Sequence, residues 1–271
     1  MLLNTLLEGT TDPMDSLYRL AYARGFLVEQ QGNDIVISDN ASDCSRAKDL
    51  PTDRSDWDDL LCQIKGMVEV RGNRIVSYTD KFSANKTYER FFVQNDHISY
   101  ETVNMNYRAT YEFFKKSESP AKVLTLELEP FVAMYVKALS SIKIHTFESC
   151  QGHDERPSVK IRLAGKCHAA FHEALWAVDD GLKRFELSWN PSQMETDMAI
   201  HYNTKIRQSI FAKVIRAGQY IYEHRFDFRS LRERVGHAIT KDDAEMSLDK
   251  LTQKMSDIIK SCELINSPKH Q

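Results

Sequence analysis

The sequence lacks the long apolar runs that mark membrane proteins, and its first residues do not have the pattern expected of a secretory leader. No apolar run approaches the roughly 20 residues that a membrane-spanning helix needs. The first eight residues include no basic residue and are too short for a signal peptide. We therefore expect a cytoplasmic protein with no membrane partner.

Cysteines are few, and their spacing does not match that of a disulfide-rich domain. The five cysteines are odd in number and widely spaced, which favours reduced thiols over a disulfide scaffold. The sequence also has no phosphate-cradling Gly-rich loop, no Gly-x-Ser-x-Gly elbow and no His-Glu-x-x-His helix. These absences argue against a P-loop NTPase, a serine hydrolase of the elbow type and a zincin.

The charge of the chain is nearly balanced overall but unevenly distributed. The formal net charge is −3 and the pI is near 6.3, so the protein is not generically basic. Residues 1–60 carry 12 acidic against 5 basic residues, whereas residues 201–241 carry 9 basic against 3 acidic. With 42% hydrophobic residues in 271, the chain is long enough for more than one domain. We predict three parts: an N-terminal α+β domain over 1–118, a central domain over 119–192 and a C-terminal helical region over 193–271 that packs on the rest.

The N-terminal part contains a weak internal repeat. Residues 24–36 and 65–76 share a pattern in which a glycine follows an amphipathic stretch and a Gly-Asn pair lies between two short apolar runs. Glycine suits the end of a helix, and Gly-Asn suits a tight hairpin turn. The pattern predicts a duplicated helix–β-hairpin, αββ·αββ. Residues 79–118 are compatible with strands or with a loop-rich bridge.

The central part alternates strand and helix patterns. Strands are indicated at 123–129, 144–148, 158–163 and 185–189, and helices at 131–142 and 165–181. The order β-α-β-β-α-β predicts a ferredoxin-like, split βαβ domain in an α+β protein. In the remaining chain the pattern predicts helices over 195–222, 227–238 and 242–262.

The segment Thr146-Phe147-Glu148-Ser149-Cys150-Gln151-Gly152-His153 is the strongest candidate site. It places a thiol and an imidazole three residues apart, on either side of a glycine, in the connection that follows a strand. Such a pair suits either a metal site, with zinc as the candidate ion, or an activated thiolate with a histidine base. Glu148 or Asp154 would orient the imidazole. The alternative is a plain hairpin turn in which Cys150 packs inward.

Two other groups of residues are candidates for a functional site. His168 and His172 lie four apart on a predicted helix and could complete a four-ligand zinc site, but the intervening strand carries that helix roughly 20 Å away. The ferredoxin-like plan therefore argues against their joining Cys150 and His153. Arg225, Arg229 and Arg232 share a helix face and could hold phosphate, since arginine forks bind phosphate oxygens in pairs. Alternatively, this basic stretch docks on the acidic N-terminal part.

The segment around Cys150 is similar to a Ser-Ser-Cys-Ser-Gly-Arg segment in the tRNA wybutosine-synthesis methyltransferase family. The similarity is confined to this segment, and His153 stands where that family has arginine. The resemblance agrees with a site at a strand end, near a phosphate-bearing ligand.

We therefore predict an enzyme that acts on a nucleotide or a nucleic-acid-like phosphate ligand through the turn from Cys150 to His153. One alternative is a non-catalytic adaptor or assembly protein that meets a protein partner or a second copy through its C-terminal helices. Another is a nucleic-acid-binding module without catalysis.

Overall fold

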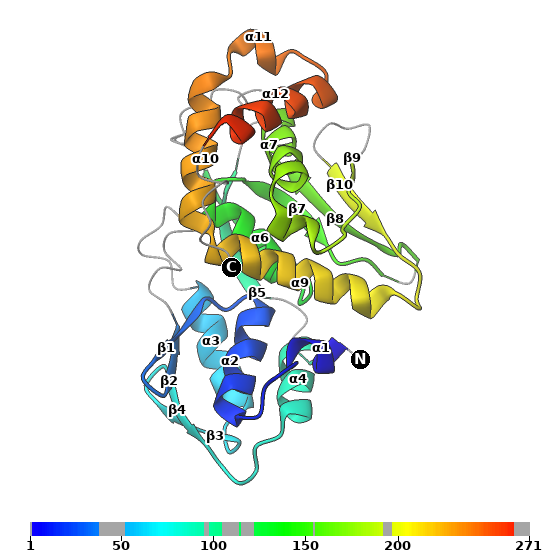
Figure 1. Cartoon of the computed structure of the whole chain (residues 1–271). Helices are drawn as coiled ribbons and strands as arrows, with labels where there is room; N and C mark the ends of the chain where they lie inside the picture. The colour runs from blue at the N-terminus through cyan, green and yellow to red at the C-terminus, as the bar shows by residue number, and fades with distance from the viewer. Residues whose placement is uncertain are drawn as a thin grey trace.

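The computed structural model describes residues 2–37, 52–94, 98–104, 114, 122–153, 155–191 and 197–262. It shows a mixed α+β protein, as predicted (Figure 1). None of the helices in these ranges is long and apolar enough to cross a membrane.

The N-terminal part contains the predicted repeat. Its elements are α1 (Leu2–Leu6), α2 (Pro13–Arg24), β1 (Val28–Gln31), β2 (Asp34–Ile37), α3 (Thr52–Gln63), β3 (Val68–Arg71) and β4 (Arg74–Tyr78). The two hairpins join into one antiparallel sheet of order β1-β2-β4-β3, so the two copies meet through their second strands. The apolar residues Leu17, Leu20 and Trp57 of the two helices are buried.

Residues 84–92 form a helix rather than one of the strands considered for this stretch. The helix is α4 (Ala84–Phe92), and it begins where the Ser83 side chain accepts a hydrogen bond from the amide of Lys86. Thr87 and Phe91, four residues apart, are buried on one face. β5 (Ile98–Asn104) follows. The domain boundary expected at residue 118 lies outside the described residues.

The central part begins with β6 (Lys122–Leu128), α6 (Ala133–Ser141), β7 (Thr146–Cys150), β8 (Ser158–Leu163) and α7 (Lys166–Val178). β6 pairs antiparallel with β5, and β7 starts a second four-stranded sheet of order β7-β8-β10-β9. The short helix α8 (Asp180–Lys183) and the strands β9 (Asn190–Pro191) and β10 (Asp197–His201) complete this part.

The ferredoxin-like arrangement is not confirmed. It requires β6 to lie beside β8, but β8 has β7 on one side and β10 on the other, while β6 contacts β7. The expected strand at 185–189 is irregular, and Glu186 there has a φ of 47°, which is incompatible with an extended strand. The start of the helix expected at 195–222 is instead β10.

The C-terminal helices cover the central part. They are α9 (Arg207–Glu223), α10 (Arg225–Ala238), α11 (Lys241–Ala244) and α12 (Leu248–Ser261), with the expected break at His224. α12 packs on α7 and α10, and its buried residues include Leu251, Met255 and Ile259. The apolar face of α12 is therefore covered within the chain.

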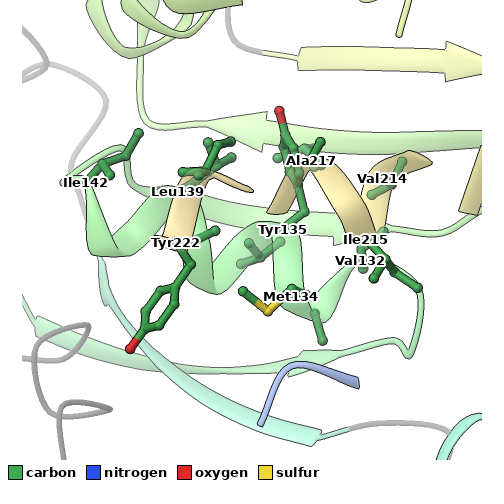
Figure 2. Packing of buried hydrophobic residues seen from close by; sticks show 14 of the residues in the cluster. Val132, Met134, Tyr135, Leu139, Ile142, Val214, Ile215, Ala217 and Tyr222 are labelled. Atoms are coloured by element: carbon green, nitrogen blue, oxygen red, sulfur yellow. The ribbon is translucent and has the colours of Figure 1, made fainter. Parts of the chain in front are cut away.

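Helix α6 lies at the centre of the molecule, and every one of its residues is buried. It packs against α9 through the residues shown in Figure 2, among them Tyr135, Leu139, Val214 and Ala217. The two helices approach closely at Gly218, where a Cβ atom would come within 2.8 Å of the Tyr135 main chain. The buried apolar residues form one cluster that extends from Leu2 to Cys262.

Candidate metal site

The turn after β7 is built around Gly152. Its φ of 86° is the left-handed conformation that glycine adopts most easily. The turn closes where the amide of His153 donates to the carbonyl of Arg156 at 3.2 Å and the amide of Arg156 donates back at 2.9 Å. Tyr202, just after β10, donates its hydroxyl hydrogen to the carbonyl of Gln151 at 2.8 Å. The turn is thus fixed by hydrogen bonds within itself and to the neighbouring strand.

A carboxylate from another strand meets this turn. Glu129 directly follows β6, and its Oε2 accepts a hydrogen bond from the amide of Gln151 at 2.5 Å. The side chain of Gln151 in turn accepts a hydrogen bond from the amide of Phe131 at 3.2 Å. The carboxyl ends of β6 and β7, which α6 connects, therefore meet at the site.

Glu129, Cys150 and His153 converge at this point. The Nε2 atom of His153 lies 3.3 Å from Oε1 of Glu129, and one donor atom from each of the three residues lies within 4.8 Å of the others. Donor atoms on a tetrahedron around zinc, at 2.0–2.3 Å from the ion, lie about 3.3–3.8 Å apart. The three side chains are therefore close to the spacing of a zinc site, and all three belong to the residue types that bind zinc.

The cluster opens to solvent on the histidine side. The side chain of His153 is 67% exposed, whereas that of Glu129 is 11% exposed. Cys150 is half-buried. An ion held here would have protein on one side and free access for a small ligand on the other.

The environment of Cys150 keeps its thiol protonated when no cation is present. Burial is the largest cause that raises the pKa of Cys150, and the Glu129 carboxylate raises it further. The amide of Gly152 donates to Sγ at 3.3 Å and the charge of Lys160 lies nearby, and both act in the opposite direction. A carboxylate beside the thiol opposes a free thiolate but favours a cation bound by both groups.

Glu148 does not orient the imidazole, which is a correction to the expectation from the sequence. It lies directly opposite Arg162 in the pairing of β7 with β8, and its carboxylate accepts a hydrogen bond from that guanidinium. Arg162 also binds Asp197 across the next pair of strands. The carboxylate that contacts His153 is Glu129. Asp154, the other candidate, lies outside the described residues.

The three arginines expected to bind phosphate make contacts within the chain. Arg229 donates twice to the carbonyl of Ser141, at 3.1 and 2.7 Å, and so caps the C-terminal end of α6. Arg232 is buried and donates to the carbonyls of Lys143 and Phe114. Arg225 donates to the carbonyl of Tyr222 and lies between two aromatic rings.

His168 and His172 are not members of the cluster. Both are buried on α7, where His168 packs against Phe114 and the oxygen of Tyr135 lies 2.5 Å from Nε2 of His172. Their absence from the site agrees with the argument from the length of β8.

Two residues that hold the site were not predicted from the sequence. Tyr202 lies in a stretch expected to be helical, so no signal pointed to it. Glu129 did carry a signal, because it ends a predicted strand just before a crossover helix. In a ferredoxin-like sheet another strand would lie between Glu129 and Cys150 and separate them by roughly 10 Å. Because we predicted that sheet, we did not expect Glu129 to contact Cys150.

Comparison of the chain with protein-family models, with curated proteins and with solved structures found no match.

Proposed function

We propose that the protein is a zinc-dependent enzyme whose ion is held by Glu129, Cys150 and His153. The observation that carries the proposal is the convergence of these three side chains at the ends of β6 and β7, with the imidazole open to solvent. Three protein ligands that leave one position for water are typical of catalytic zinc, whereas structural sites use four. Zinc held by these residues would supply Lewis-acid chemistry and would lower the pKa of a bound water.

A phosphate ester, of the nucleotide or nucleic-acid type, is the substrate class we propose. Two exposed cations flank the cluster and would take the role expected of the α10 arginines. Arg156 is paired with His153 across the turn, and Lys160 is the strand partner of Cys150. Their positive charges would hold the phosphate beside the site, where zinc would supply the chemistry of metal-assisted hydrolysis.

Metal content tests the first step. Protein purified without exposure to affinity metals is expected to contain about one zinc ion per chain by mass spectrometry. Cys150→Ala, His153→Ala and Glu129→Gln should each weaken zinc binding by roughly 100-fold or more, because each removes a ligand. Glu148→Gln is the matched control, because its carboxylate binds Arg162, and it should keep the metal. A wild-type protein that binds no zinc at micromolar concentration would overturn the proposal.

Activity tests the second step. The zinc-loaded protein should hydrolyse an activated phosphodiester such as bis(p-nitrophenyl) phosphate, and Arg156→Gln should raise KM while zinc content stays unchanged. X-ray absorption of wild type beside Asp154→Asn distinguishes an open site from a closed one. The zinc would be structural if Asp154→Asn loses a fourth protein ligand that the wild type has and neither protein hydrolyses the substrate. That outcome would favour the non-catalytic alternative.

A further inference from the structure

A pocket of about 460 Å³ lies between α9, the short helix α1 and the end of α8. Figure 1 shows α1 lying along α9, far from it in sequence. The size falls within the range of small-ligand pockets, which is about 300–1,000 Å³. Ala212 lines the buried side, and the exposed Gln208 and Ser209 line the rim. No residue of the pocket belongs to the Glu129–Cys150–His153 cluster.

The pocket is lined by three cationic side chains, those of Arg184, Lys213 and Arg216. Arg216 is held in place because its Nη2 donates to the carbonyl of Thr5 at 2.9 Å. No acidic residue is among the residues that line the pocket. An anion placed in it would therefore meet positive charge from two helices.

Two of these cations pair with carboxylates that do not line the pocket and that face solvent. Glu186 lies 3.6 Å from Lys213 and is 81% exposed, and Glu8 lies 3.0 Å from Arg216 and is 76% exposed. Exposed ion pairs of this kind contribute little stability. A ligand anion could replace either carboxylate as the partner of its cation with small loss.

One wall of the pocket is aromatic. Phe185 and Tyr220 both line it, with ring centroids 6.2 Å apart and planes inclined at 56°. Tyr220 is also in ring contact with His224, with the two centroids 4.3 Å apart, which restricts its movement. Rigid aromatic rings beside cations are the combination that binds a flat heterocycle joined to a phosphate.

We propose that this pocket binds an anion that carries a flat ring, of the nucleoside monophosphate class. The ring packs against Phe185 and Tyr220, and the phosphate replaces the outward carboxylates as the partner of Lys213 and Arg216. The inference is independent of the zinc site, since the two sites share no residue.

Titration calorimetry with AMP, adenosine and inorganic phosphate tests the proposal on the full chain. AMP is expected to bind at least 10-fold more tightly than either fragment, because only AMP fills both halves of the pocket. Raising the salt concentration should weaken AMP binding, because the phosphate contacts are ionic. Inorganic phosphate binding as tightly as AMP, or no AMP binding at millimolar concentration, would overturn it.

Variants locate the binding. Lys213→Gln should weaken AMP binding at least 10-fold, and Ala212→Leu should block it by filling the buried side of the pocket. Lys260→Gln, an exposed lysine on α12, is the matched control and should bind as wild type does. If Ala212→Leu does not fold, the AMP affinity of Lys213→Gln alone tests whether AMP binds in this pocket. Glu129→Gln should also bind AMP normally, and loss of binding in that variant would move the ligand to the zinc site and contradict the proposal.

Discussion

The hydroxyl of Tyr202 occupies the space that a side chain on Gly152 would need. A Cβ atom at Gly152 would lie 2.5 Å from the Tyr202 oxygen and 2.6 Å from the carbonyl oxygen of Ser158. Position 152 therefore requires glycine for two reasons, its left-handed backbone and its lack of a side chain. The turn that carries Cys150 and His153 depends on both.

Gly152→Ala should destabilise the protein by about 2–5 kcal/mol. The left-handed backbone costs an alanine about 1–2 kcal/mol, and the clash adds the cost of overpacking, about 1–3 kcal/mol. Gly72→Ala is the control, because Gly72 has a φ of 62° and a Cβ atom there would meet nothing within 4 Å. Urea unfolding should show only the backbone cost for Gly72→Ala. Equal losses in the two variants would contradict the packing argument.

Tyr202→Phe removes the hydrogen bond to the carbonyl of Gln151 and keeps the ring. We expect a loss of about 1 kcal/mol in stability, together with zinc binding that is roughly 10-fold weaker, because the turn loses a support of its ligands. Tyr78→Phe, at a tyrosine that is 47% exposed, should change neither quantity. Zinc affinity unchanged in Tyr202→Phe would show that the hydrogen bond does not position the ligands.

Arg232→Met should cost about 2–4 kcal/mol. The substitution keeps much of the side-chain volume but leaves the carbonyls of Lys143 and Phe114 without the donors that Arg232 now supplies. Arg234→Met, at an exposed position on the same helix, should stay within about 0.5 kcal/mol of wild type. A small effect of Arg232→Met in thermal unfolding would mean that water satisfies these carbonyls.

His168 should make the protein less stable in mild acid. Burial lowers the pKa of His168 well below its ordinary value of 6.5, and the charges of Arg232 and His145 lower it further. Between pH 6.5 and the folded pKa the unfolded chain binds the extra proton, so stability falls as pH falls, by up to about 1.4 kcal/mol per unit. Above pH 6.5 both states are neutral at this position and the effect vanishes.

The slope of stability against pH tests this sign. His168→Phe should flatten it between pH 6.5 and 5, whatever the stability of that variant at pH 8. His237→Gln replaces an exposed histidine on α10 and should retain the wild-type slope. A wild-type slope in His168→Phe would assign the acid sensitivity to other groups.

The sequence predicted those elements whose pattern is local. The αββ repeat follows from amphipathic helices that end at glycine and from hairpins with Gly-Asn turns. β10 was wrongly expected to be helical, because Met198, Ala199 and Ile200 precede a true helix without a breaker. These residues form a strand because they pair with β8, where Met198 lies opposite Ile161. Such long-range pairing overrides the local propensity for helix. In α4 the aromatic residues suggested strands, although the spacing of Thr87 and Phe91 was helical.

The candidate site could be predicted in part for the same reason. Cys150, Gly152 and His153 lie within four residues, so their proximity is local and the sequence displays it. Glu129 reaches them only because β6, which pairs with β5, contacts β7 of another sheet. Contact between strands of different sheets depends on the whole fold, and no short segment encodes it.

The contact between α1 and α9 also constrains how the chain folds during synthesis. The carbonyl of Thr5 accepts a hydrogen bond from Arg216, and the amide of Leu2 donates one to Gln208, so Leu2 and Thr5 contact residues made about two hundred positions later. At about 5–20 residues per second, the ribosome needs on the order of 10–40 s to deliver that surface. Until then the apolar residues Leu2 and Leu6 lack their native cover, and a nascent-chain chaperone that binds short apolar segments has that interval in which to act.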